Sequence, residues 1–233
     1  MHHMELRKNN LYQDNQWLEK TQFIDDQLKK EHFATINLPD LNLDGFLRLS
    51  YGFGEVIKAG RETPLVTEIK TNRNYGNKEL ELHNDKTYWA IPPRYEMLYI
   101  VEANGMTGGD ILKSSILDCY LRLSIAKQKL LRETDVEIRS PNNRDGSVIK
   151  APLVNYINEN LAFFRCRADI INADSEVKEI FNELYSELIN NTVAFPAKTG
   201  DLFIFDNWLA AHGRSIASFN QDGYRLAFRT LVI

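Results

Sequence analysis

The segment 95-YEMLYIVEANGMTGGDILKSS-115 contains two apolar runs of strand length, and asparagine and glycine separate them. Similar runs occur on both sides of it: 64-PLVTEIKT-71, 79-ELELH-83, 192-TVAFPA-197, 201-DLFIFD-206 and 224-YRLAFRTLVI-233. Glycine, proline and asparagine between such runs indicate turns. Many short strands with few βαβ alternations predict a mostly β fold, an antiparallel sandwich or barrel with flanking helices.

Three segments of the chain are predicted to be helical. Residues 12–31 have amphipathic spacing, residues 118–132 form a second segment, and a third begins at Asp174, whose side chain can cap it. Residues 32–58 predict a strand, a turn and a short helix. The apolar face of the third helix recurs at spacings of three and four residues: Val177, Ile180, Phe181, Leu184 and Leu188.

Length and composition are those of a globular chain of ordinary size, so residues 1–233 are expected to form a single domain. Residues 1–4, Met-His-His-Met, resemble a tag remnant. The net charge is −4 with mixed signs, which predicts no nucleic-acid partner. The sequence predicts neither a membrane-spanning segment nor a signal peptide. Cys119 and Cys166 lack CxxC spacing, which favours buried thiols in a reducing, cytoplasmic compartment.

The segment 80-LELHNDKTYW-89 places a histidine and an aspartate two residues apart in a strand-like run. Side chains two apart on a strand point the same way, so His83 and Asp85 can aim at one point while Asn84 faces away. Such a pair can supply two adjacent metal ligands. A surface histidine beside a solvated aspartate is the alternative, and it is the more common reading of this motif alone.

A third ligand is expected from a neighbouring strand, and His212 in 200-GDLFIFDNWLAAHGRS-215 is the candidate. It follows a buried strand and a short loop in which Asp206 and Asn207 form a turn. Two histidines and one carboxylate leave open positions on one face of a metal, as in non-haem Fe(II) oxygenases. Zinc more often has a further histidine or cysteine ligand, although zinc sites with two histidines and a glutamate exist.

Arg225 and Arg229 lie in the last strand-like run, thirteen and seventeen residues after His212. An arginine can hold a carboxylate in a bidentate grip, and the far carboxylate of 2-oxoglutarate needs a fixed cation of this kind. Surface charges on an edge strand are the alternative for both residues.

The blocks 83-HNDKTYWAIPPRYEMLYIVEANGMTGGD-110, 200-GDLFIFDNWLAAHGR-214 and 224-YRLAFR-229 resemble the Fe(II)/2-oxoglutarate oxygenases of the taurine dioxygenase, clavaminate synthase and gamma-butyrobetaine hydroxylase type. The resemblance covers roughly residues 33–233 and is weak in the middle. It implies a double-stranded β-helix (jelly roll), with Fe(II) at His83, Asp85 and His212. It also implies that 2-oxoglutarate and O2 react there, that Arg225 holds 2-oxoglutarate and that Arg229 lies near the substrate.

One position departs from the family pattern. Many relatives have threonine after Gly-Gly-Asp, where its hydroxyl helps to hold 2-oxoglutarate, but this chain has Ile111. Lys113, two residues on and facing the same side, is the candidate replacement donor. Because Asp85 keeps the carboxylate that iron halogenases of this type lack, halogenation is not expected.

The resemblance implies hydroxylation of an unactivated C–H bond, or desaturation or ring closure, in a small polar substrate such as an amino acid or carboxylic acid. The alternatives are a hydroxylase of protein side chains and a non-catalytic, cupin-like metal-binding protein. Tyr88 and Trp89 are either core aromatics or a cage for a cationic substrate. Arg165 either reaches the pocket or is exposed. The oligomeric state and the substrate are not determined by the sequence.

Overall fold

The computed structural model describes residues 15–60, 62–140, 148–159 and 161–233. The predicted tag remnant and the first three residues of the predicted helix at 12–31 lie outside this part of the chain. The assignment of residues 1–233 to one domain and the cytoplasmic location stay predictions. None of the helices in the described residues is long and apolar enough to cross a membrane.

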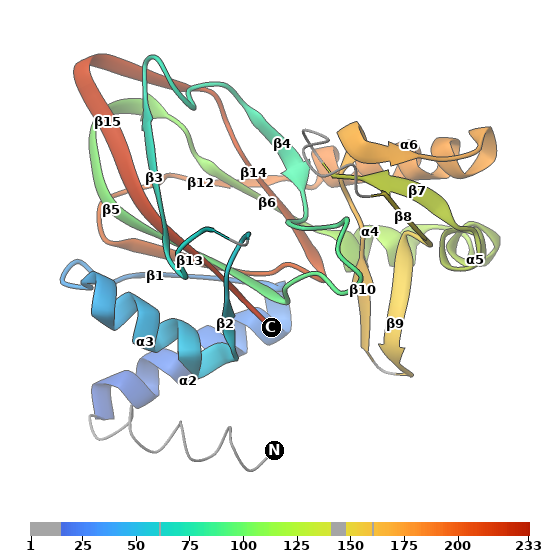
Figure 1. The fold of residues 1–233 in the computed structure, drawn as a ribbon, viewed down its shortest axis with the longest axis horizontal. Helices are drawn as coiled ribbons and strands as arrows, with labels where there is room; N and C mark the ends of the chain where they lie inside the picture. Colours follow the sequence, from blue (N-terminus) through green and yellow to red (C-terminus); the bar gives the residue numbers. More distant parts are fainter. Residues whose placement is uncertain (1–14, 61, 141–147, 160) are drawn as a thin grey trace.

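A six-stranded antiparallel sheet forms the larger wall of the fold (Figure 1). Its strands pair in the order β1, β13, β5, β15 and β2, and β3 also pairs with β15. The strands are β1 (Phe33–Asn37), β2 (Val56–Ile57), β3 (Thr67–Asn72), β5 (Tyr95–Gly108), β13 (Asp201–Asp206) and β15 (Ala217–Val232).

A four-stranded antiparallel sheet forms the second wall, in the order β12, β6, β14 and β4. These strands are β4 (Leu80–His83), β6 (Ile111–Ser115), β12 (Val193–Phe195) and β14 (Ala210–Arg214). The two walls form the double-stranded β-helix, so the predicted fold class is confirmed. Smaller pairings add β7 (Val136–Arg139), β8 (Val148–Ala151), β9 (Val154–Asn158), β10 (Leu161–Phe164) and β11 (Ile171–Asn172).

Alternation along each strand separates the interior of the barrel from its outer face. On β5, Met97 and Tyr99 face outward into a core under the first helices, whereas Ile100 faces inward. On β13, Leu202 faces outward and Phe203 inward. Because both faces of these strands are buried, the run DLFIFD is apolar almost throughout.

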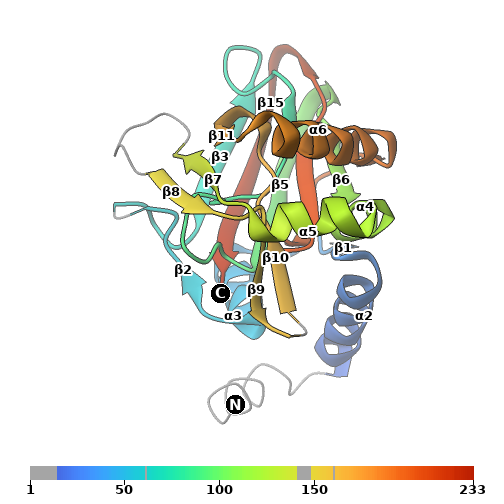
Figure 2. The same ribbon diagram turned by 90° about the vertical axis from the view of Figure 1, so that its right-hand side faces the viewer.

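Helices cover the outer face of each wall. The outer face of the six-stranded sheet packs against α2 (Asn15–Glu31) and α3 (Leu43–Phe53) (Figure 1). The four-stranded sheet packs against a group with α4 (Ile116–Arg122), α5 (Ile125–Glu133) and α6 (Ser175–Asn190), seen from the front in Figure 2. A 3-10 turn, η1 (Ala168–Ile170), precedes β11.

The helix predictions hold with two differences. The predicted helix at 118–132 is two helices, because the chain leaves the helical conformation at Leu123 and Ser124 caps α5 by accepting a hydrogen bond from the amide of Lys127. α6 follows Asp174 as predicted, but the Asp174 side chain makes no capping bond. The five predicted apolar residues of α6 are all buried.

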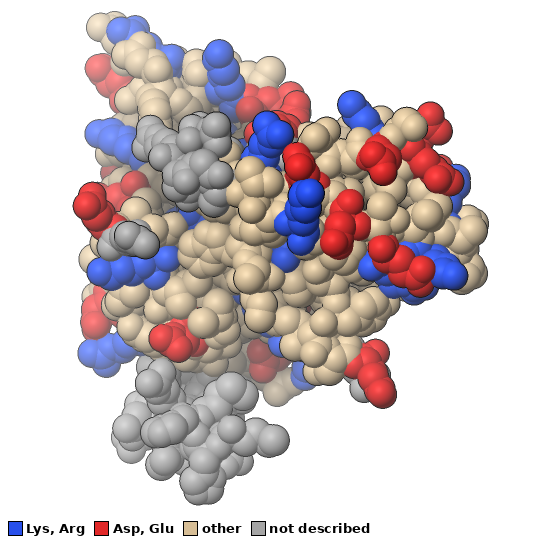
Figure 3. All heavy atoms as spheres, turned by 45° about the vertical axis from the view of Figure 1, so that its right-hand side comes forward, with Lys and Arg blue, Asp and Glu red and all other residues tan. Residues whose placement is uncertain are grey.

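The surface carries charges of both signs. On the face drawn in Figure 3, acidic and basic side chains are interspersed among uncharged ones. This pattern matches the mixed composition behind the small net charge of −4.

Candidate metal centre

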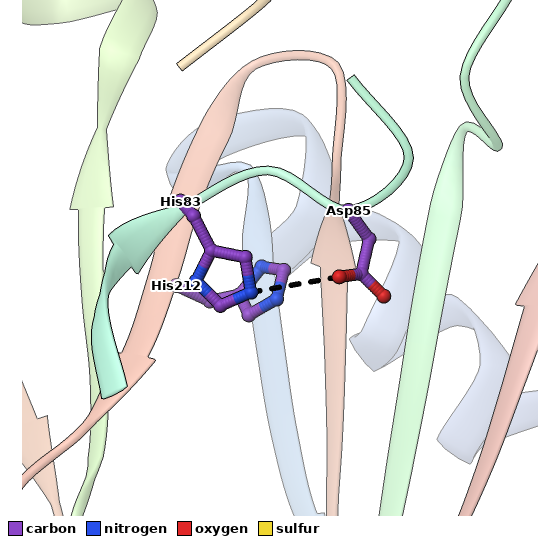
Figure 4. A group of neighbouring side chains, drawn as sticks. All are labelled: His83, Asp85 and His212. Carbon is purple, nitrogen blue, oxygen red and sulfur yellow. Dashed lines mark ion pairs between the residues drawn. The ribbon is translucent and has the colours of Figure 1, made fainter. Parts of the chain in front are cut away.

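His83, Asp85 and His212 meet at one point inside the barrel (Figure 4). One ligand atom from each residue lies within 4.8 Å of the other two, and all three residues are buried. His83 Nε2 lies 3.5 Å from Asp85 Oδ1, and the two imidazole ring centres are 4.6 Å apart. Two imidazoles and one carboxylate in this arrangement fit a divalent iron ion with open positions.

Both histidines come from the four-stranded sheet. His83 ends β4 and pairs in register with His212 on β14, so both side chains point into the barrel from adjacent strands. His212 therefore lies on a strand that neighbours β4, after the short turn that follows β13. Gly213 permits the close approach of these strands, since a Cβ there would lie 2.5 Å from the Leu80 carbonyl oxygen.

Asp85 reaches the cluster from a turn that follows β4. Asp85 thus points toward His83 because of the turn and not because of strand alternation. The Asn207 side chain fixes the turn: its Oδ1 accepts from the Asp85 amide at 2.7 Å, and its Nδ2 donates to the Asp85 carbonyl at 3.1 Å. Asn84 faces away from the metal cluster, as predicted, and its amide donates to the carbonyls of Asn207 and Ala210.

Burial keeps the two imidazoles in the form that binds metals. Desolvation lowers the pKa of His83 to about 3, and the same cause lowers the pKa of His212 to about 3. Both rings are therefore neutral near pH 7, with a nitrogen lone pair available to a metal. His83 Nδ1 lies 2.8 Å from the Glu81 carbonyl, which can only accept, so the proton lies on Nδ1 and Nε2 is left for the metal.

A cavity of about 180 Å³ adjoins the cluster, between the two walls. Arg225 on β15 lines it, is buried, and donates from Nη1 to the Gly109 carbonyl at 3.0 Å. Arg214 on β14 lines the same cavity, and neither guanidinium has a partner for its Nε. Burial, and then the charge of Arg214, lower the pKa of Arg225 to about 10. Two adjacent cations with unused donors fit a bound carboxylate such as that of 2-oxoglutarate.

Arg229 lies between two carboxylates. Its Nη2 contacts Asp85 Oδ2, and its Nε donates to Glu96 Oε1 at 2.8 Å. Glu96 in turn has its Oε2 3.0 Å from His212 Nε2. Burial raises the pKa of the Glu96 carboxyl to about 7, against the opposing effects of His83 and of the Lys86 ammonium. Arg229 thus lies next to the metal cluster but is already paired.

Lys113 is not brought to the cavity. Its Nζ lies 3.4 Å from Glu31 Oε2 at the end of α2, and the residue is not among those that line the cavity. Ile111 does line the cavity and packs in the apolar interior with Phe205. Among the described lining residues there is no serine, threonine or tyrosine, and Arg214 has an unused donor that could bind a carboxylate held by Arg225.

Tyr88 and Trp89 follow Asp85 in the chain, and Arg165 contacts the backbone of that segment, but none of the three lines the cavity. The ammonium of Lys86 lies 5.7 Å from the ring centre of Tyr88 and 5.4 Å from that of Trp89, so a cation of the chain itself already faces both rings. Arg165 is buried and donates to the carbonyls of Thr87, Trp89 and Ala90, which fixes the backbone after Asp85.

Sequence reasoning missed Glu96 and Arg214 as members of the site. Glu96 is the one charged residue in the apolar run YEMLYIV, and this could have indicated its role. A charge in a buried strand needs a partner, and the metal site is a place where such partners gather. Arg214 lies two residues after His212, which places both side chains on the cavity side of β14.

The chain is similar in fold to several solved oxygenases. A structure of asparagine oxygenase with Fe(II), hydroxyasparagine and succinate has a TM-score of 0.74 and 16% identity, over 90% of this chain and 77% of that one. The structure of the non-haem iron oxygenase OrfP with Fe, succinate and dihydroxyarginine has a TM-score of 0.73 and 17% sequence identity, and the match covers 91% of this chain and 77% of OrfP. The structure of the PvcB protein of Pseudomonas aeruginosa has a TM-score of 0.68 and 20% sequence identity, and the match covers 95% of this chain and 80% of PvcB.

A search of curated protein sequences found no match. The family model described as taurine catabolism dioxygenase TauD, TfdA family, matches residues 10–231, which is nearly the whole chain. That match and the His83–Asp85–His212 cluster agree with the residues that carried the resemblance in the sequence. The chain therefore belongs to the TauD/TfdA dioxygenase family and is an Fe(II)- and 2-oxoglutarate-dependent oxygenase.

Proposed function

We propose that the enzyme hydroxylates an unactivated C–H bond of a small polar metabolite, such as an amino acid or carboxylic acid, and releases succinate and CO2. The proposal rests on one observation: the residues that can bind a metal and the arginines that can bind a carboxylate line the same cavity. The metal cluster lies beside two guanidiniums that can hold the far carboxylate of a keto acid.

The protein groups have separate tasks in this proposal. His83, Asp85 and His212 hold Fe(II), and Arg225, with Arg214 beside it, holds 2-oxoglutarate. When bound, Fe(II) and 2-oxoglutarate would supply, together with O2, the oxidant for the C–H bond: one oxygen atom of O2 would go to succinate and the other to the substrate. The chain orients the two cosubstrates, and the apolar lining around Ile111 and Phe205 keeps water from their reacting ends.

The size of the cavity supports a small substrate. At about 180 Å³ and between two walls, it gives little room for a protein segment, which would need an open groove. Desaturation of the same substrate would use the same ligands. The asparagine oxygenase and OrfP structures contain bound hydroxylated amino acids, which is consistent with this substrate class.

Succinate release in the presence of Fe(II) and 2-oxoglutarate, screened over a metabolite library, tests the proposal. We expect one or more small polar metabolites to stimulate release and to gain one oxygen atom by mass spectrometry. Stimulation only by a protein or peptide would contradict the small-substrate assignment.

Replacement of Arg225 by alanine tests the cosubstrate role. Removing Arg225 leaves the buried carboxylate with Arg214 as its remaining cation, and losing the partner that holds it costs about 2–5 kcal/mol, so the 2-oxoglutarate requirement should rise by orders of magnitude. Arg73→Ala, at an exposed position, is the control and should leave the requirement unchanged. An unchanged requirement in Arg225→Ala would remove Arg225 from this role.

A further inference from the structure

Glu96 is a buried carboxylate on the cavity wall with no task in the reaction described above. It lies on β5, where the next inward-facing residues are Leu98 and Ile100. The residue is 6% exposed and lines the same cavity as the metal cluster. Its ligand atoms are outside the group of three that can share a metal. A buried charge at this place is costly unless something compensates it.

One oxygen of Glu96 is compensated by Arg229, and this pairing changes what Arg229 can do. The guanidinium donates to Glu96 Oε1 at 2.8 Å and contacts Asp85 Oδ2 with its other end. The negative charge of Asp85 is balanced by the metal ion that it binds. The positive charge of Arg229 is then balanced by the negative charge of Glu96. Arg229 is therefore not a free cation that could receive a sulfonate or carboxylate of the substrate.

The second oxygen of Glu96 is buried and has no hydrogen-bond donor. Its neighbour at 3.0 Å is His212 Nε2, but this contact does not have hydrogen-bond geometry. A ring nitrogen that binds a metal also has no proton to donate. A residue that lines the cavity thus has a carboxylate oxygen without a proton donor, and this oxygen lies beside the metal cluster.

We infer that Glu96 binds a positively charged nitrogen of the primary substrate, an ammonium or a guanidinium. The substrate is then a cation or a zwitterion with its nitrogen toward the metal cluster, and not an anion held by Arg229. This inference rests on the proposed function, because it names the substrate class of the same site.

Binding without turnover tests the inference separately from catalysis. The protein is loaded with Fe(II) and 2-oxoglutarate without oxygen, and calorimetry measures the binding of a fixed panel of probes. The panel contains the twenty common L-amino acids, agmatine as a cation without a carboxylate, and ethanesulfonate and glutarate as anions without nitrogen. Wild type should bind at least one of the nitrogen cations and neither of the two anions.

Two variants of Glu96 sharpen the test. Glu96→Gln keeps the shape and removes the charge, so the Kd of the bound cation should rise by about tenfold or more. Glu96→Asp keeps the charge and should bind the cation more tightly than Glu96→Gln. Glu68→Gln, the same change at an exposed position of β3, is the control and should bind as wild type does.

Four outcomes would overturn the inference: binding of the anions in preference to the cations, no binding of any nitrogen cation, unchanged binding in Glu96→Gln, or loss of Fe(II) binding in Glu96→Gln. The last would make Glu96 a metal ligand. Failure of the proposed function is a different result. It would be seen as wild-type protein that binds the cation but releases no succinate when oxygen is admitted.

Discussion

His212 and Asp85 reach the same metal centre from two different kinds of backbone. His212 lies within β14, whose neighbours β6 and β4 set its position by strand register. Asp85 lies in an irregular turn that is held by the buried side chains of Asn84, Asn207 and Arg165. The strand ligand therefore depends on local pairing, whereas the turn ligand depends on polar residues from distant parts of the chain.

Replacement of Asn207 by alanine should have the largest effect, because it disturbs the turn that holds Asp85 and leaves the strand that holds His212 in place. The variant leaves the Asp85 amide, the Asp85 carbonyl and the Pro93 carbonyl without their partner, at about 1–3 kcal/mol for each unpaired group. Fe(II) affinity should fall by about 10–100-fold, as is typical when the partner of a ligand is removed.

Metal titration and chemical denaturation measure both effects of Asn207→Ala. Asn182→Ala, at an exposed position of α6, is the control. If Asn207→Ala bound Fe(II) as tightly as wild type does, the turn would hold Asp85 without its asparagine, and the comparison would fail.

Replacement of Arg165 by methionine should have an intermediate effect. The variant removes the donors to three carbonyls of the turn, so the free energy of unfolding should fall by about 1–3 kcal/mol. Fe(II) affinity should fall less than in Asn207→Ala, because Arg165 contacts the backbone beyond Asp85. Hydrogen exchange should be faster at the amides of 86–90 and unchanged on β14. Faster exchange on β14 as well would show that the two ligands are not independently held.

Replacement of Lys113 by methionine should have the smallest effect. Lys113 is next to His212 in the strand pairing but forms an ion pair with Glu31, whose side chain is half exposed. Such a pair contributes about 0–1 kcal/mol. The 2-oxoglutarate requirement should stay at the wild-type level, in contrast to Arg225→Ala. A large rise in that requirement would return Lys113 to the cosubstrate role expected from the sequence.

The regular parts of the site could be predicted from the sequence better than the irregular parts. Strand alternation and apolar spacing are local, so the sheets, the face of α6 and the inward direction of His83 were predictable. The turn at Asp85 depends on Asn207, 122 residues away, and no local pattern reports such a bond. The pairing of Lys113 with Glu31 likewise depends on where α2 packs, which strand spacing does not reveal.

Metal binding by His212→Ala tests the central claim most directly. Wild type should bind one Fe(II) tightly and release succinate from 2-oxoglutarate. His212→Ala should keep the fold, measured by circular dichroism, and lose both tight Fe(II) binding and succinate release. His32→Asn, which removes an imidazole outside the cluster, should behave as wild type does. If His212→Ala bound Fe(II) with wild-type affinity, the metal centre would not be the cluster of His83, Asp85 and His212.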